Sequence, residues 1–153
     1  DTMTRPLSLR RAAPADAQVI AEFNLAMALE TEHKRLDPDT VHAGVLAVLT
    51  DARRGFYWLA EREGEIVGGL MVTYAWSDWR NADFWWIQSV YVRPDARRSG
   101  VFAALYREIE AQARQAGACG LRLYVEDSNL TAMATYLRQG MHDAHYRVME
   151  HGF

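Results

Sequence analysis

The feature that most constrains the fold is a near-continuous apolar run, DFWWIQSVYVRP, at residues 83–94. A strand with apolar side chains on both faces is typical of the centre of a sheet that helices cover on both sides. The run is followed by PDARRSG and then, with no further break, by a helical pattern. The sequence therefore predicts a layered α/β protein built around a central strand, a loop and a helix.

The helix after the loop is predicted at residues 98–116. Val101, Leu105, Ile109 and Ala113 recur every four residues in this segment. Apolar side chains at that spacing lie on one face of a helix. We expect this face to pack on the sheet that contains the central strand.

The rest of the chain alternates between short strand and helix patterns with polar or glycine-containing breaks. Strands are expected at 7–13, 56–63, 65–76, 121–127 and 141–153, and helices at 14–30, 36–51 and 129–139. The order β-α-α-β-β-β-α-β-α-β predicts a mixed sheet flanked by helices. With 153 residues, half of them hydrophobic, the chain fits one domain, residues 1–153, that can bury its own core.

Charge and composition argue against several classes of protein. A formal net charge of −3 disfavours a general nucleic-acid binder, which usually carries a basic face. The single cysteine, Cys119, excludes an internal disulfide, and the scattered histidines show no metal-ligand spacing. No apolar run is long enough to span a membrane, and the N-terminus lacks the apolar core of a signal peptide. We expect a cytoplasmic protein without a metal, a nucleic-acid partner or a membrane segment.

The loop at residues 97–102 has the features of an anion site. A helix N-terminus carries a partial positive charge and several unpaired N–H groups. Gly100 has no side chain to obstruct an approaching oxygen, and Arg97 and Arg98 add positive charge. A strand that feeds a helix through such a loop can bind a phosphate group. The alternative, left open here, is that Ser99 only caps the helix and the arginines are solvated.

Two motifs give the loop a family context. The run SVYVRPDARRSGVFAALYREIEAQARQAG, residues 89–117, resembles the central motif of the GNAT superfamily of N-acetyltransferases. In that family a V-x-V-x-P strand precedes an Arg/Gln-x-x-Gly-x-Gly/Ala loop and a helix. Residues 97–102 match this loop, with Phe102 in place of the usual small residue. The run VEDSNLTAMATYLRQGM, residues 125–141, resembles the family's next motif, with Met141 in place of phenylalanine.

The resemblance implies that acetyl-coenzyme A is the co-substrate and that no metal is needed. The loop amides would hold its pyrophosphate, and a slot between the central strand and the next parallel strand would hold its pantetheine arm. The residues that the resemblance assigns to the cofactor are Val90, Tyr91, Val92, Arg97, Arg98, Ser99, Gly100, Val101, Phe102, Asn129 and Tyr136. Asn129 is equally well explained as a helix cap.

The resemblance also implies acetyl transfer to a primary amine. Tyr136 is the expected general acid for the leaving thiolate, because a phenol stays protonated at neutral pH. Its alternative role is packing of the helix on the sheet. Glu126 is the first candidate for the base that deprotonates the amine, and deprotonation through water needs no single base. Further carboxylates considered for this role are Glu30, Glu32, Asp78 and Asp83.

The acceptor is expected to be a small-molecule amine, with a peptide or protein amine as an open alternative. Glu30, Trp76 and Gln88 are the candidate acceptor contacts. Aromatic residues cluster at 74–86 and can line a pocket for a cationic acceptor, form a structural cluster, or cover a dimer surface. The exposed aromatics among them are compatible with a homodimer.

Two other functions fit parts of the sequence. A non-catalytic acyl-CoA-binding or regulatory protein would keep the loop at 97–102 and need no proton donor at Tyr136. A nucleotide- or phosphate-binding module would share only the strand, loop and helix, and would leave residues 125–141 without a role.

Overall fold

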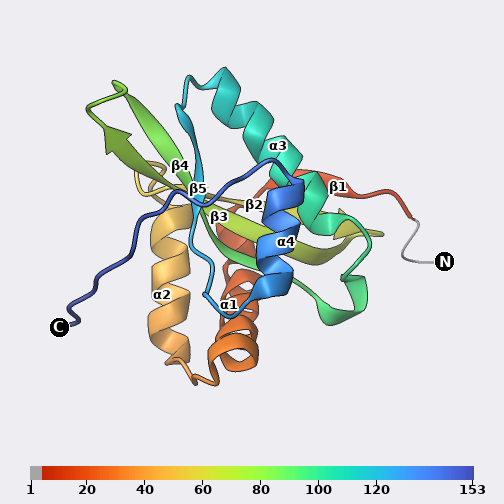
Figure 1. The fold of residues 1–153 in the computed structure, drawn as a ribbon. Helices are drawn as coiled ribbons and strands as arrows, with labels where there is room; N and C mark the ends of the chain where they lie inside the picture. Colours follow the sequence, from red (N-terminus) through yellow and green to blue (C-terminus); the bar gives the residue numbers. More distant parts are fainter. Residues whose placement is uncertain (1–4) are drawn as a thin grey trace.

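A computed structural model describes residues 5–153, in which five strands form one mixed sheet of order β1-β2-β3-β4-β5 (Figure 1). The strands are β1 (Ser8–Arg11), β2 (Phe56–Arg62), β3 (Glu65–Ser77), β4 (Ala82–Val92) and β5 (Gly120–Leu123). Neighbours from β1 to β4 are antiparallel, and β5 runs parallel to β4. The prediction of a mixed α/β sheet with the 83–94 run as an interior strand is confirmed.

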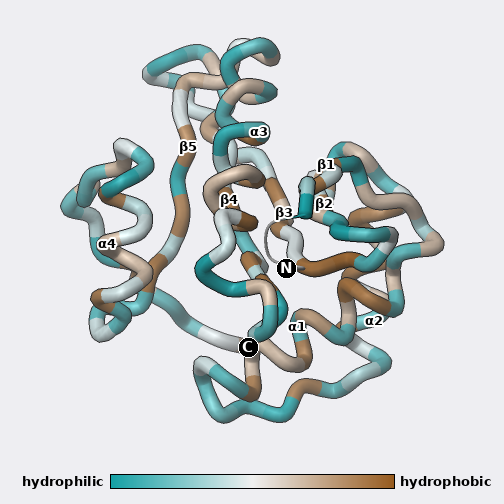
Figure 2. The backbone as a smooth tube through the Cα atoms, turned by 90° about the vertical axis from the view of Figure 1, so that its right-hand side faces the viewer, coloured by the Kyte–Doolittle hydropathy of each residue, from teal (hydrophilic) through white to brown (hydrophobic). Residues whose placement is uncertain are grey.

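Four helices cover the two faces of this sheet: α1 (Ala17–Glu32), α2 (Pro38–Leu49), α3 (Val101–Gln115) and α4 (Leu130–Arg138). Figure 2 shows α3 on one side of the sheet and α1 with α2 on the other. Each side has its own apolar cluster, so β2, β3 and β4 are buried between two layers of helix. This arrangement explains why residues 83–94 carry apolar side chains on both faces.

The α3 face of the sheet holds the larger cluster. Val101, Leu105, Ile109 and Ala113 are all buried there, which confirms the four-residue spacing. The helix begins at Val101 rather than at residue 98, because the three residues before it form the loop that connects it to β4. The N-terminus of α3 is therefore held at a fixed position beside the end of the central strand.

The opposite face is covered by α1 and α2, which contact each other and pack on Tyr57 and Leu59 of β2. Asp37 caps α2: its carboxylate accepts from the Thr40 amide at 3.0 Å. This cap supplies a partner for one of the free amides at the helix start.

The predicted strand at 141–153 is wrong, so the final β of the expected order is missing. Residues 142–153 form no strand or helix and are exposed. Met141 is the last residue that packs on the core, and its amide bonds the Tyr136 carbonyl at the end of α4. A strand is stabilised by burying one of its faces, whereas residues 142–153 are exposed and join no strand of the sheet described in residues 5–153.

Candidate active site

The loop between β4 and α3 leaves a set of amides open. Gly100 has a left-handed φ of 83°, and Arg98 has a φ of 62°, which few non-glycine residues adopt. The first intrahelical bond of α3 joins the Ala104 amide to the Gly100 carbonyl, and no side chain caps the helix. The amides of the first turn therefore point outward beside left-handed loop residues, an arrangement that forms anion-binding concavities.

Ser99 does not cap α3, which answers the alternative left open by the sequence. Its hydroxyl donates to the Ala96 carbonyl at 2.5 Å and accepts from the Arg62 guanidinium at 2.7 Å. Ser99 thus fixes the shape of the loop, while the amides of the first helical turn stay free.

Arg62 is a residue that sequence reasoning missed. It lies on β2 with only 6% of its surface exposed, and it donates to both the hydroxyl and the carbonyl of Ser99 and to the Arg5 carbonyl. Within residues 5–153 it forms no ion pair with a carboxylate. A buried cation without a carboxylate partner, directly behind an anion-binding loop, raises the positive potential of that loop. No signal in the FYWLAER stretch distinguishes it from an ordinary strand-end arginine.

Arg97 and Glu30 join the loop to α1. The guanidinium of Arg97 lies 2.8 Å from the Glu30 carboxylate and donates to the Val92 carbonyl at 2.9 Å. The Tyr91 hydroxyl donates to the other Glu30 oxygen at 3.0 Å. The Arg97 hydrogen bond, and then that of Tyr91, holds the pKa of Glu30 below its usual value. Glu30 was expected to contact the acceptor. Its carboxylate instead bonds with Arg97 and Tyr91, two residues that were expected to bind the cofactor.

The strand pairing leaves one side of β4 open where the slot was expected. β4 pairs with β5 only over four positions, Phe84 to Ile87, and from there to Val92 it has a neighbour only on the β3 side. Opposite β3 the register shifts between Gly69 and Met71, where Ser89 has a left-handed φ of 52°. A bulge of this kind leaves a backbone group of the bulged strand out of the ladder. On the side that faces away from β3, no strand pairs with residues 88–92, and the Val92 carbonyl accepts from Arg97.

Tyr136 lies against the start of α3. Its ring meets that of Phe102 edge to face, with the centroids 5.6 Å apart. Burial raises the pKa of the Tyr136 hydroxyl. Among the described residues no hydrogen bond to this hydroxyl is formed. Phe102, the departure from the family motif, is the surface on which Tyr136 is positioned.

The side chains of Asn129 and Glu126 form only local hydrogen bonds, with residues two or three positions further along the chain. The Asn129 side chain accepts from the Ala132 amide at 3.1 Å and caps α4, so the helix-cap explanation of this residue holds. Glu126 is exposed and accepts from the Ser128 hydroxyl at 3.2 Å. Both residues belong to the turn that leads from β5 into α4.

The three expected acceptor contacts do not come together. Gln88 lies opposite Met71 on the face covered by α1 and α2, the face on which the Tyr91 ring meets Phe23 of α1, and Gln88 donates to the Thr73 hydroxyl at 2.6 Å. Trp76 follows the alternation of Val72 and lies on the α3 face. Glu30 and Gln88 therefore share one face, and Trp76 is on the other.

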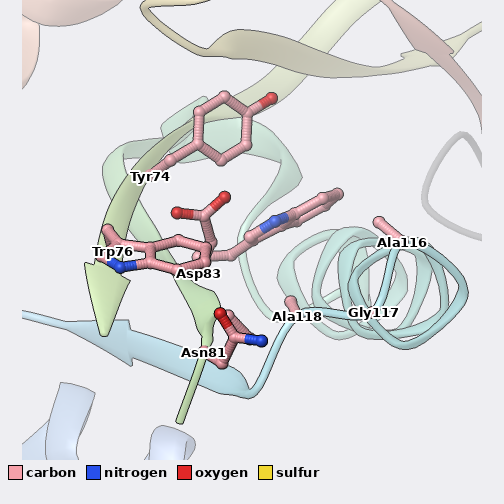
Figure 3. A pocket seen from close by; sticks show the side chains of 9 residues that line it. Tyr74, Trp76, Asn81, Asp83, Ala116, Gly117 and Ala118 are labelled. Atoms are coloured by element: carbon pink, nitrogen blue, oxygen red, sulfur yellow. The ribbon is translucent and has the colours of Figure 1, made fainter. Parts of the chain in front are cut away.

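Trp76 instead lines a cavity of about 420 Å³ at the far end of α3 (Figure 3). Its walls include Tyr74, Asp83 and residues 116–118 just after α3, and Figure 3 shows the Asp83 carboxylate between the rings of Tyr74 and Trp76. The 15 residues of α3 separate this cavity from the loop by about 22 Å. A ligand in this cavity cannot reach a group held at the N-terminus of α3.

The described part of the chain contains no group of three or more His, Cys, Asp or Glu side chains that could hold a metal ion. Within residues 5–153, no helix combines the length and the hydrophobicity needed to cross a membrane.

Comparison with known proteins gives a consistent result. A profile of the acetyltransferase (GNAT) family matches residues 22–141. A possible acetyltransferase from Clostridium difficile 630 is 41% identical over 96% of this chain and 97% of its own, with a TM-score of 0.90. None of the curated proteins compared with the chain matches it.

More distant structures share the fold alone. A transcriptional regulator from Bacillus halodurans C-125 is 19% identical over 96% of this chain and 100% of its own, with a TM-score of 0.83. A predicted acetyltransferase with acetyl-CoA from Clostridium acetobutylicum is 13% identical over 95% of this chain and 96% of its own, with a TM-score of 0.78.

Proposed function

The chain belongs to the acetyltransferase (GNAT) family, and from this premise we propose that it moves an acetyl group from acetyl-CoA to the primary amine of a small molecule. Three features in one region support this proposal. They are the open amides before and within the first turn of α3, the end of β4 that β5 does not pair with, and Tyr136, whose ring packs on Phe102. Together these provide an anion site, a slot and a proton donor in one region.

The loop fits the pyrophosphate of acetyl-CoA. A side chain at Gly100 would meet nothing within 4 Å, so the space in front of the amides is open. The amides of Gly100, Val101 and Phe102 would bind phosphate oxygens, and Arg98, which forms no ion pair within residues 5–153, would add a mobile positive charge. The main chain of Val90, Tyr91 and Val92 would pair with the amide groups of the pantetheine arm.

Acetyl transfer to an amine has three chemical requirements that the protein can meet. The amine nitrogen must be neutral, the thioester carbonyl must be polarised, and the sulfur must receive a proton as the carbon–sulfur bond breaks. An unpaired amide at the bulge around Ser89 can polarise the carbonyl. Tyr136 supplies the proton to sulfur, and its raised pKa keeps it protonated over the whole neutral range.

The amine also needs a base that accepts its proton. Glu126 is the candidate base because it follows β5 at the open end of the slot. It is exposed, and its hydrogen bond from Ser128 leaves the second carboxylate oxygen available to water. We therefore propose that Glu126 acts through a water molecule. Deprotonation by solvent alone would leave the activity of Glu126→Gln unchanged.

Acetyl-CoA titration tests the cofactor assignment. Calorimetry of the wild type, of Arg98→Glu and of the matched variant Arg107→Glu, an exposed arginine further along α3, separates loop charge from general charge. We expect micromolar binding that only Arg98→Glu weakens, by tenfold or more. ATP in excess, which has the phosphates but no pantetheine arm, should compete weakly. Absence of acetyl-CoA binding would overturn the proposal.

An amine panel tests the reaction itself. Wild type and Tyr136→Phe would be assayed for thiol release with polyamines, amino acids and short peptides as acceptors. Turnover with a small amine supports the proposal, and turnover with peptides alone would move the acceptor class to protein amines. Binding of acetyl-CoA without thiol release for any amine would favour a non-catalytic acyl-CoA-binding protein.

A further inference from the structure

The cavity at the far end of α3 is built on two neighbouring cross-strand pairs of β3 and β4. Tyr74 pairs with Trp85, and Trp76 pairs with Asp83. Residues two apart on a strand point to the same face, and directly paired residues share that face, so these four side chains lie together. Residues 116–118, just after α3, line the opposite wall (Figure 3). The cavity of about 420 Å³ thus combines three aromatic rings with one carboxylate.

The inner aromatic rings are held in place by the core. Trp85 is 8% exposed, and its ring meets that of Tyr74 edge to face with the centroids 5.8 Å apart. Phe56, a buried residue of β2, packs against both rings. Trp76 is 63% exposed, so much of its ring surface is open to a ligand. A ligand would therefore meet aromatic surfaces that are already ordered, which lowers the entropic cost of binding.

Asp83 brings a negative charge that the described part of the chain does not neutralise. Its carboxylate forms no ion pair and accepts no hydrogen bond within residues 5–153. Figure 3 shows this carboxylate between Tyr74 and Trp76. The main chain of Asp83 is fixed, because its carbonyl accepts from the Cys119 amide at 2.9 Å. A partly buried carboxylate without a partner favours a positive group beside it.

The arginines of the surrounding elements are engaged elsewhere. The guanidinium groups of Arg80 and Arg122 lie over the Phe84 ring, at 4.9 Å and 3.6 Å from its centroid. Phe84 alternates with the residues that line the cavity and so lies on the other face of the sheet. The Arg11 guanidinium lies over the Phe56 ring, at 4.8 Å from its centroid. No side chain within residues 5–153 therefore acts as the counter-charge in the cavity.

We propose that this cavity is a second ligand site, which binds a small quaternary ammonium ion. The positive group lies against the rings of Tyr74 and Trp76, with the Asp83 carboxylate as its counter-charge. The faces of aromatic rings attract such cations. A quaternary ammonium has no N–H group to satisfy, which suits a cavity whose walls are largely aromatic. The volume admits a head group of this kind with a short chain.

This site is separate from the proposed site of acetyl transfer. Ser89, at the bulge proposed to polarise the thioester, follows Asp83 by about 20 Å along β4. A quaternary nitrogen also has no lone pair and cannot accept an acetyl group. The cation is therefore not the acceptor, and its binding does not depend on the proposed acetyl transfer.

The five tryptophans of the chain can locate the ligand. Each gives one indole N–H signal in proton–nitrogen correlation spectra, assigned by replacing each tryptophan in turn with phenylalanine. Choline, added at constant ionic strength, should shift the signals of Trp76 and Trp85 with a Kd of about 1 mM or below. The signal of Trp79, an exposed tryptophan outside the cavity, should not move.

Dimethylbutanol isolates the contribution of the charge. It has the shape of choline, with carbon in place of the charged nitrogen. Because it gains nothing from the carboxylate or from cation–π attraction, it should bind at least about tenfold more weakly than choline. Equal binding of the two compounds would overturn the proposal and leave the cavity an apolar hollow.

Two matched pairs of variants test the residues. Asp83→Asn and Trp76→Ala should each weaken choline binding by about tenfold or more. Asp78→Asn and Trp79→Ala, which change exposed residues outside the cavity, should leave the Kd unchanged. Urea unfolding should show that all four variants stay folded, because none of the four side chains is buried. Equal effects within a pair would contradict a site in this cavity.

Three further outcomes would also overturn the proposal. One is the absence of any shift at about 10 mM choline. Another is a shift confined to Trp86, whose ring stacks on Tyr124, because alternation places Trp86 on the other face of the sheet. The third is competition between choline and acetyl-CoA, which would place the cation in the acetyl-transfer site. The titrations are first made without acetyl-CoA, so a failure to bind acetyl-CoA would leave their result intact.

Discussion

The guanidinium of Arg97, in the loop before α3, lies 2.8 Å from the carboxylate of Glu30, near the end of α1. The pair connects the element that is proposed to bind pyrophosphate with the helix that borders the face on which Gln88 and Tyr91 lie. Any movement of α1 relative to the loop must break or rebuild this contact. The pair is therefore a direct physical link between the loop proposed to bind acetyl-CoA and the face of the sheet that carries Gln88.

Glu30→Gln should lower stability slightly and in a pH-dependent way. The pKa of Glu30 is depressed, chiefly by the Arg97 hydrogen bond, so its contribution is present above the unfolded pKa and is lost as the pH falls through the lower folded pKa. Because both side chains are more than a third exposed, we expect less than about 1 kcal/mol. Urea unfolding at pH 7 and at pH 3 should show a larger difference from wild type at pH 7 than at pH 3. An equal difference at both values would contradict the role of ionised Glu30.

Gly100→Ala should weaken acetyl-CoA binding as well as stability. The left-handed φ of 83° costs a residue with a side chain about 1 kcal/mol, although the added methyl group has free space. Gly64, in the turn between β2 and β3, is a matched control with a φ of 80° and equally free space. Thermal unfolding should show similar losses for both alanine variants, whereas calorimetry with acetyl-CoA should show weaker binding only for Gly100→Ala. Equal affinities would mean that the loop amides do not bind the co-substrate.

Arg62→Lys should destabilise the loop between β4 and α3, because Arg62 holds Ser99 in this loop. Lysine keeps the charge but cannot donate at once to the hydroxyl and carbonyl of Ser99 and to the Arg5 carbonyl. Loss of one or two charge-assisted hydrogen bonds at a buried site is expected to cost about 1.5–3 kcal/mol in unfolding free energy. Arg93→Lys, at an exposed ion pair, is the control and should change little. The unfolding midpoints in urea decide between these outcomes. A loss of stability as small as that of Arg93→Lys would mean that the hydrogen bonds of Arg62 to Ser99 and Arg5 do not hold the loop in place.

The sequence was informative where one pattern dominated. The apolar run at 83–94, the four-residue spacing of α3 and the glycine loop between them each have one low-energy arrangement, and the structure has all three. The strand predicted at residues 141–153 was wrong because alternation of apolar and polar residues predicts a strand but does not identify the sheet edge that it would join. Arg62 was missed because its importance depends on a contact with Ser99, 37 residues away in the chain. Trp76 and Gln88 lie on opposite faces because of the register of β3 against β4, which pairs Trp76 with Asp83 and Met71 with Gln88, and the sequence does not mark this register.

Tyr136→Phe should separate binding from chemistry. Removing the hydroxyl leaves the ring on Phe102, so acetyl-CoA affinity should stay the same while kcat falls by about 10²–10⁴-fold, the usual contribution of a general acid. Tyr106→Phe is the control, because burial raises the pKa of Tyr106 as it does that of Tyr136, and the Tyr106 ring also contacts Phe102. A donor must be protonated to act, and burial raises the pKa of Tyr136, so wild-type kcat should decline only at a pH above the ordinary pKa of a tyrosine. The residual kcat of Tyr136→Phe should lack this decline. A kcat equal to that of Tyr106→Phe would remove Tyr136 from the proton transfer and leave it a packing residue of α4.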